Sequence, residues 1–344
     1  MHLQLPLGRE TDPTVRSARL LAIILVLAFV VANLLTSRWS HRLIYRKQLE
    51  IIRTAQNPNL IFVGASTVAG GVKTDAFVQG AKGAFFRPLN AALGAAGPPE
   101  QRLLFQYAIR SHPGIKELVL GFGDFQITEP QHTELGDLTG NRMVGFDWRF
   151  PLSEVSTVYG FNQLEQAELE GLRSVPVIAI RRNFLQYVET LHDSRYFDSM
   201  RRRLESWGLL RAGSSDSENL KNYAMAAAAT PEGFDAHARA FIAHPDHFSA
   251  DFESILSQAQ NAGMSVVLVV MPMSPTHRAA FYSRPLWRQY VGTLSALCAR
   301  RGIRFIDAGE WNPSAQDFKD EFHLNDQGAQ KFSLRLGAEF ALPH

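Results

Sequence analysis

Three residues of this chain have the types and surroundings that nucleophilic acyl chemistry needs. Ser66 directly follows an apolar run, and His323 lies near the other end of the chain, three residues after Asp320. A serine hydroxyl attacks a carbonyl carbon efficiently when a base removes its proton, and imidazole is a common base. A carboxylate beside the imidazole holds it in one tautomer through the other ring nitrogen. The sequence therefore predicts a Ser-His-Asp site.

Each half of this group also has a purely structural interpretation. The small residues before the serine let the chain turn sharply into a helix, whose free N–H groups suit an oxyanion, but a serine there can also be only an N-cap. A lone histidine near a helix start is usually structural, and here Asn325 or Asp326 is expected to cap the last helix. Asp317 and Glu321 compete with Asp320 as partners of the histidine, and we expect both to be solvent-exposed.

The rest of the chain alternates between strand and helix patterns. Five short apolar runs are typical of strands: 60–64, 85–90, 117–122, 265–271 and 304–307. Their scarcity of polar alternation favours a parallel sheet covered on both faces. Helical patterns occur at 99–111, 251–262, 286–301 and 327–340. This order predicts an α/β fold with a doubly wound, mostly parallel five-stranded sheet, whose functional site forms at the carboxyl ends of the strands.

One long interval, at about 125–250, shows no parallel strand. It contains the helical stretches 177–191 and 199–207, and the second carries three consecutive arginines at 201–203. A segment of this length is too long for a bare loop, so we expect a large, mainly helical insertion beside the site. The arginines are expected to form a solvated helix face. The alternative is that they grip an anionic polymer or a lipid headgroup.

The N-terminal region predicts a membrane anchor. The run 20–36 is uncharged over seventeen residues, which corresponds to about 25 Å of helix. A cleaved signal peptide normally ends in small residues, whereas this run ends in the basic sequence SRWSHR. We therefore divide the chain into a tail (1–19), an anchor (20–36), a juxtamembrane segment (37–59) and a soluble domain (60–344). Basic residues flank both ends of the run, so the positive-inside rule does not choose a side.

Composition excludes several classes of function. The 344 residues carry a formal net charge of only +2, which gives no reason to expect nucleic acid as a partner. The single cysteine, Cys298, excludes an internal disulfide and a multi-cysteine zinc site. His237, His244 and His247 are scattered through a polar region without a convincing ligand set, so no metal is expected. The glycine-rich motifs of nucleotide cofactors do not occur, and we expect no cofactor.

Together these pieces resemble the SGNH (GDSL-type) hydrolase superfamily. In that family the nucleophilic serine follows the first strand, and a D-x-x-H motif precedes the last helix; Ser66, Asp320 and His323 match these positions. The resemblance runs from about residue 60 to the end, apart from the insertion, and implies an SGNH/flavodoxin-like sheet. Its most specific part is DEFHLNDQGAQ, at 320–330. The sequence GAST departs from the family's G-D-S by having Ala65 in the middle.

Two further blocks of the family have counterparts. The stretch NAALGAAGPP resembles the block that supplies a glycine N–H to the oxyanion hole, with Gly94 as the expected donor. The third block, G-x-N-D, reads Gly-Phe-Gly-Asp, so Gly123 replaces an asparagine whose side chain is another donor. Losing one such donor typically costs about 100- to 1000-fold in turnover. Asp124 is expected to fix the loop, with a direct catalytic role as the alternative. His277 should lie near the site, as a substrate contact or a surface residue.

The anchor, the missing asparagine and the insertion resemble one branch more than the secreted esterases. This branch is the membrane-tethered SGNH-like proteins, including those of alginate O-acetylation and teichoic acid D-alanylation; VVLVVMPMSPTH, at 266–277, is also similar. The resemblance implies an O-acyltransferase or esterase acting on a cell-envelope polysaccharide or related polymer. It also implies an extracytoplasmic soluble domain and a membrane-bound acyl-transfer partner. The alternative is a non-catalytic SGNH-fold protein of envelope binding or assembly, which Gly123 favours.

Overall fold

The structure, a computed structural model, describes residues 13–40, 44–82, 86–94, 96–128, 150–179 and 231–341. The chain forms two compact units. The first comprises 1–46, 135–152 and 161–193, and the second comprises 47–134, 153–160 and 194–344. All of the candidate site residues belong to the second unit.

The first unit contains the long helix α1 (Pro13–Trp39), together with α8 (Gln163–Ser174) and α9 (Pro176–Ala179). Helix α1 includes the whole expected anchor and extends beyond it at both ends. Its large apolar side chains, from Leu20 to Leu35, are exposed. By length and composition α1 can cross a membrane, although a signal sequence meets the same criterion.

The second unit is built on the expected five-stranded, all-parallel sheet. Its strands are β1 (Leu60–Val63), β2 (Pro88–Asn90), β3 (Glu117–Phe122), β4 (Ser265–Val270) and β5 (Arg304–Asp307). They lie in the order β2-β1-β3-β4-β5, so the prediction of a doubly wound α/β fold is confirmed. The direction of strand addition reverses at β1. The carboxyl ends of β1 and β3 therefore border the crevice where such sheets bind their ligands.

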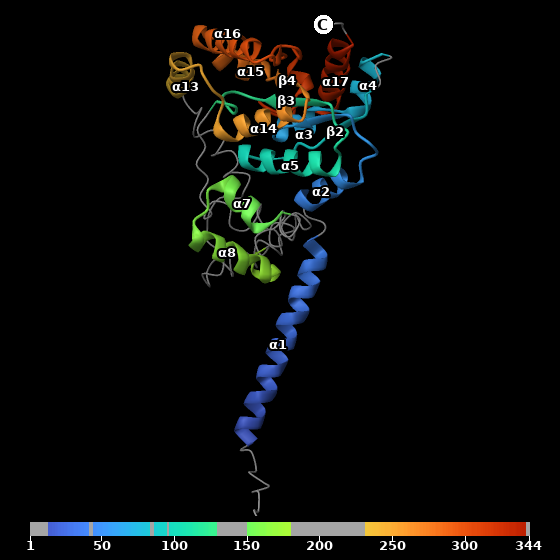
Figure 1. Ribbon diagram of the computed structural model, residues 1–344, viewed down its shortest axis with the longest axis vertical. Coiled ribbons are helices and arrows are strands. Elements are labelled where there is room, and N and C mark those ends of the chain that lie inside the picture. The colour runs from blue at the N-terminus through green and yellow to red at the C-terminus, as the bar shows by residue number, and fades with distance from the viewer. Residues whose placement is uncertain are drawn as a thin grey trace, which may run out of the picture. The chain divides into compact units, whose positions relative to one another are not determined.

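Helices cover both faces of the sheet (Figure 1). Helices α5 (Pro98–Ser111) and α14 (Ala250–Asn261) pack together on one face. Helices α3 (Ser66–Gly71), α4 (Thr74–Gly80) and α17 (Asp326–Phe340) share a buried apolar cluster on the other. Phe77 is at the centre of this cluster, with its ring centroid 5.2 Å from those of both Phe62 and Phe340. Helix α3, which begins at Ser66, and helix α17, which follows His323, thus pack in the same core.

Two glycines let α4 and α17 touch backbone to backbone. A Cβ atom at Gly80 would overlap the carbonyl oxygen of Leu334, and one at Gly337 would overlap that of Phe77. Neither position therefore tolerates a side chain without moving a helix. This close crossing fixes α17 on the sheet, and with α17 the loop that precedes it.

The remaining described elements are α2 (Ile44–Thr54), α7 (Leu152–Tyr159), α13 (Pro231–Ala243), α15 (Pro275–His277), α16 (Pro285–Arg300), a π-helical turn (Arg278–Tyr282) and a 3-10 turn (Ala315–Asp317). The expected core elements agree to within a residue or so, except that β2 begins at Pro88 rather than at 85. The described part of the insertion is mainly helical, as expected. The stretches 180–191 and 199–207, including the three arginines, lie outside the described residues.

Candidate functional site

Ser66 is placed by an unusually close contact between α3 and the sheet. Cβ atoms at Gly64 and Gly121 would both collide with the Cγ2 methyl group of Val68. Because these two positions carry no side chain, Val68 packs directly over β1 and β3 and holds α3 against them. The first residue of α3 is Ser66, which is half-buried at the carboxyl end of β1.

The structure brings Ser66, His323 and Asp320 into contact. His323 Nε2 lies 2.8 Å from Ser66 Oγ, and His323 Nδ1 lies 2.9 Å from both carboxylate oxygens of Asp320. A carboxylate only accepts hydrogen bonds, so this network assigns the proton to Nδ1 and leaves Nε2 to accept from the serine hydroxyl. This is the tautomer that a general base needs.

The environment of Asp320 keeps its carboxylate ionised. Burial raises the pKa of this group, but hydrogen bonds outweigh it, and the pKa lies below the usual 3.8. The amides of Phe322 and His323 donate to Asp320 Oδ1 at 2.9 and 2.8 Å, and the His323 ring donates to the same carboxylate. The side chains of His323 and Asp320 are 37% and 53% exposed, so the site is open to solvent.

The loop that carries Asp320 and His323 is closed at its base. Phe318 and Leu324 form an antiparallel bridge, and the amide of Lys319 donates to the carbonyl of His323 at 2.8 Å. These bonds give the loop a defined shape before any substrate arrives. We call residues 318–324 the histidine loop.

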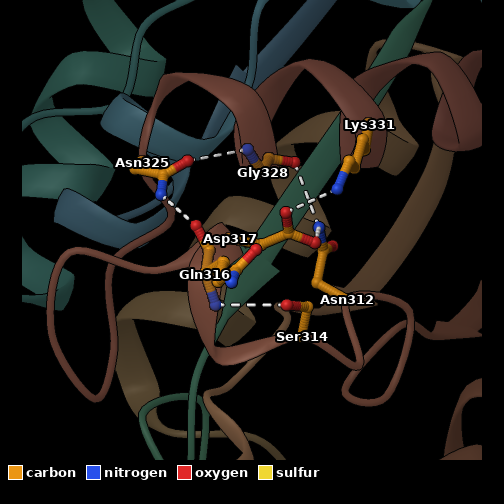
Figure 2. A network of polar contacts seen from close by, with 7 residues as sticks. All are labelled: Asn312, Ser314, Gln316, Asp317, Asn325, Gly328 and Lys331. Carbon is orange, nitrogen blue, oxygen red and sulfur yellow. Dashed lines mark hydrogen bonds and ion pairs between the residues drawn. The ribbon is translucent and has the colours of Figure 1, made fainter.

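A polar network ties the histidine loop to α17 (Figure 2). Asp317 accepts from Lys331 Nζ at 2.7 Å and from the side-chain amide of Asn312 at 3.3 Å. The amide of Asn325 donates to the carbonyl of Asp317 at 2.9 Å, and a Cβ at Gly328 would overlap that same carbonyl. As expected, Asn325 caps α17 by accepting from the amide of Gly328. The network therefore fixes both ends of the histidine loop.

The expectation that Asp317 is exposed was wrong. Its side chain is only 3% exposed, because Gly328 lets the loop approach α17 closely and Lys331 compensates the buried charge. Glu321 is exposed, as expected. The carboxylate of Asp317 bonds to Asn312 and Lys331, whereas His323 Nδ1 bonds to Asp320, so Asp317 supports the loop rather than competing with Asp320.

We expect Lys331→Met to destabilise the domain by about 2 kcal/mol, because it leaves the buried carboxylate of Asp317 without its charged partner. Urea unfolding followed by tryptophan fluorescence measures this loss. The matched control is Lys319→Met, which removes an exposed lysine and should change the unfolding free energy by less than about 0.5 kcal/mol. Equal effects of the two variants would show that the Asp317–Lys331 pair does not support the loop.

Gly94 lies on a loop that is joined to the start of α3. The amide of Leu93 donates to the carbonyl of Gly64 at 3.2 Å. The side chain of Asn90 accepts from the amide of Ala92 at 3.1 Å and donates to two carbonyls of α3 and its end. Gly94 is half-buried, and its loop is thus held beside the strand end from which Ser66 projects.

Gly123 lies where the resemblance expects an asparagine, and another side chain fills that space. A Cβ atom at Gly123 would collide with the terminal methyl group of Met273. Met273 is itself buried. The thioether therefore takes the room that a side-chain donor at this position would need, and Gly123 contributes only backbone.

Asp124 belongs to a buried network after β3. Its Oδ1 accepts from the Tyr282 hydroxyl at 3.0 Å and lies 3.0 Å from His277 Nε2. The residue has a φ of +48°, which an aspartate tolerates better than most residues. Burial first, and then the charge of Asp124, raises the pKa of Tyr282 well above its usual value. The Tyr282 hydroxyl therefore stays a donor to Asp124.

His277 lies near the site but not on the surface. It is 1% exposed, so of the two alternatives given for it, a substrate contact or a surface position, the second was wrong. Its ring packs 4.9 Å from that of Phe322 in the histidine loop, and the amide of Ser274 donates to the carbonyl of Glu321 at 3.1 Å. The turn after β4 thus also contacts the histidine loop, through the ring of His277 and the amide of Ser274.

Sequence reasoning missed several supporting residues: Asn90, Met273, Tyr282, Asn312 and Lys331. Asn90 begins the stretch NAALGAAGPP, and a polar side chain directly after an apolar strand pattern was the available signal. Lys331 follows Gly328 by one helical turn, so helix periodicity places both on one face, but nothing in the pattern points that face at Asp317. Tyr282 and Met273 reach the site through tertiary packing alone.

Other candidate chemistries find little support in the described residues. No group of three His, Cys, Asp or Glu side chains among them could hold a metal ion. Burial raises the pKa of Cys298 to about 12, so its thiol is a poor nucleophile. A cavity of about 650 Å³ lies at the amino ends of the strands, beside Glu117 and Arg304. Ser66 follows the carboxyl end of β1, so this cavity is at the other end of the strands from Ser66.

Comparison with known proteins adds a fold likeness of low strength. No family model matches the chain. No curated protein matches it either. Among solved structures, it is similar to a protein from Streptococcus pneumonia described as "a putative platelet activating factor", at 12% identity and a TM-score of 0.37, covering 90% of this chain and 99% of that chain. Likeness at this level does not bear on the chemistry of the present site.

Proposed function

We propose that this chain is a membrane-anchored, serine-dependent acyl-ester enzyme. The observation that carries the proposal is the contact of Ser66 Oγ with His323 Nε2 at 2.8 Å, with Asp320 on the opposite ring nitrogen. These groups come from segments more than 250 residues apart in sequence. The carboxyl edge of a doubly wound sheet is also where a site of this fold class belongs. The sequence resemblance to SGNH hydrolases supports the same assignment.

In the proposed reaction, Ser66 Oγ attacks the carbonyl carbon of an ester while its proton passes to His323 Nε2. The tetrahedral intermediate collapses when His323 returns that proton to the leaving alcohol, and an acyl-serine remains. A sugar hydroxyl or a water molecule then attacks the acyl-serine and loses its proton to His323. The second tetrahedral intermediate collapses when His323 gives this proton to Ser66 Oγ, which releases the new ester or the free acid and restores the serine. Asp320 stays ionised throughout and holds the Nδ1 proton. Transfer and hydrolysis differ only in the acceptor.

The oxyanion is assigned to backbone donors. The amides of Ser66 and Gly94 are the candidates, because both lie beside the carboxyl end of β1. The Met273 methyl group fills the space at Gly123, so a third donor from that position is absent in this proposal. One lost donor costs about 2.7–4 kcal/mol of transition-state stabilisation. We therefore expect slow turnover on simple esters.

The substrate class follows from the openness of the site and from the anchor. His323 and Asp320 are more than one third exposed, which suits a bulky polymer better than an enclosed small molecule. A membrane helix would hold the domain near an envelope surface. We propose an acylated envelope polysaccharide or related polymer as substrate, an extracytoplasmic soluble domain, and a membrane-bound protein as acyl donor.

Hydrolysis of an acetyl-ester reporter tests this proposal. We expect Ser66→Ala to lower the rate of the purified protein by about 10³-fold or more. Ser283→Ala, which removes an exposed serine hydroxyl that donates to the carbonyl of Ala279, should leave the rate unchanged. A Ser66→Ala protein that keeps the wild-type rate would show that the activity arises elsewhere.

A non-catalytic envelope assembly protein is the second candidate. It is favoured by one observation, the Met273 methyl group in the place of a side-chain oxyanion donor. This candidate predicts no ester hydrolysis by the folded wild-type protein. It also predicts that Ser66→Ala leaves binding to the envelope polymer unchanged.

A further inference from the structure

The last two turns of α1 have two different faces. Ala32, Asn33, Thr36 and Ser37 are half-buried, whereas Leu34 and Leu35 are exposed. The half-buried positions recur at three- and four-residue intervals, so they form one stripe of small and polar side chains along the helix. Stripes of this kind let another backbone approach a membrane helix closely.

Within the same unit, α9 packs against this stripe. The amide of Val177 donates to Asn33 Oδ1 at 3.2 Å, and Asn33 Nδ2 donates to the carbonyl of Phe29 at 3.0 Å. Both polar groups of the Asn33 side chain are therefore bonded within the protein. That is the condition for an amide to lie in hydrocarbon at little cost.

The position of Asn33 sets the depth of α9. Asn33 precedes Thr36, the end of the uncharged run, by three residues, which is about 4.5 Å along a helix. An element bonded to Asn33 thus lies about 4.5 Å below the edge of the run, just short of the roughly 5–10 Å depth to which interfacial helices bury their apolar face.

The side chains of α9 suit that depth. Its sequence, Pro-Val-Ile-Ala, carries no polar side chain, and Ile178 is 45% exposed. In the sequence, Arg181 and Arg182 follow directly, and arginines are favourable at the level of lipid headgroups.

We propose that α9 is a second membrane contact of this protein, and that it inserts Ile178 into the lipid bilayer beside the end of α1. The chain would then be held at two points of the membrane surface, by a spanning helix and by an apolar turn far along the sequence. This inference depends on α1 staying in the membrane, and it is independent of the proposed acyl chemistry.

Fluorescence at position 178 tests the contact. The full chain carrying Ile178→Cys is labelled with NBD and reconstituted into phosphatidylcholine–phosphatidylglycerol vesicles. The wild-type protein is the labelling blank, because its only cysteine, Cys298, is buried with a pKa of about 12. Gln163→Cys, at the exposed distal end of α8, is the matched control. Both replaced side chains are exposed, so neither substitution opens the core.

We expect lipids brominated on the upper acyl chain to quench the label at 178 by about twofold, as for a probe at the acyl boundary. The label at 163 should respond only to aqueous iodide. Quenching at 178 by iodide and not by brominated lipid would place α9 in water and overturn the proposal. A label at 178 reached by neither quencher would place α9 against protein, which overturns it equally.

Discussion

Asp320→Asn is expected to lower kcat for an acetyl ester by about 10⁴-fold, with KM changed little. The asparagine oxygen can still accept from the amides of Phe322 and His323, so the histidine loop keeps its shape. The change removes the negative charge that stabilises the protonated ring during the reaction. The asparagine side chain can also donate to Nδ1, and the ring proton then moves to Nε2. A protonated Nε2 can no longer accept the hydrogen bond from the Ser66 hydroxyl.

Asp326→Asn is the matched control for this variant. Asp326 lies six residues further along, is highly exposed, and pairs with Lys73 on the surface, so its loss should change kcat less than about twofold. Stopped ester assays of both purified variants, with circular dichroism to confirm folding, make the comparison. An Asp320→Asn protein with more than a tenth of wild-type kcat would remove Asp320 from the proposed mechanism.

Protonation of Asp320 is expected to destabilise the site only in strongly acidic solution. Because the pKa of Asp320 is lowered below 3.8 in the folded protein, its contribution to stability is fully present above that value. The contribution disappears as the pH falls through the lowered pKa. Neutral and mildly acidic solutions therefore leave the charge on Asp320 unchanged, and any loss of activity there has another cause.

Gly337→Ala is expected to destabilise the domain by about 3 kcal/mol, at the upper end of the usual cost of overpacking. The new Cβ would overlap the carbonyl of Phe77 on α4, and a backbone atom cannot rotate away as a side chain can. Relief requires α17 to shift. Since α17 carries the anchor points of the histidine loop, we also expect ester hydrolysis to fall.

Gly292→Ala offers a control of the same chemical change. Gly292 lies inside α16, and a Cβ there would meet no atom within 4 Å. Alanine in an exposed helix interior is more favourable than glycine by about 0.5–1 kcal/mol, so this variant should be slightly more stable than the wild type. Urea unfolding curves compare the two. The same sign of change in both variants would contradict the close α4–α17 crossing.

Much of the sheet was predictable because burial leaves a clear mark on sequence. The run at 117–122 agrees with β3, since a strand buried on both faces carries few polar residues. The run at 304–307 also agrees with β5, although this edge strand is only partly buried and carries Arg304 and Asp307. Gly64, two residues before Ser66, and Gly328 both belong to family-like motifs of the sequence. In the structure each of them allows two backbone segments to approach closely. The contact of His323 with Ser66 agrees with the spatial relation that the motifs implied, while the catalytic role remains a proposal.

What the sequence could not supply were contacts decided by the packing of distant segments. Asp317 looked like a surface carboxylate because charged residues are rarely buried, and only the approach of α17 through Gly328 provides Lys331 as its partner. Met273 and Gly123 are 150 residues apart, and no periodicity links a methionine to the space that a missing side chain leaves. His277 was expected near the site, but its burial depends on rings supplied by two other segments.

The most direct test of the central claim is to locate the covalent adduct of a fluorophosphonate by peptide mass spectrometry. A serine is labelled by such a probe when its hydroxyl is activated, which here requires the His323 imidazole. We predict a single adduct on Ser66 in the wild-type protein, and its loss in a folded His323→Ala variant. An adduct on another serine, or an unlabelled Ser66 in folded wild-type protein, would contradict the assignment of Ser66 as the nucleophile.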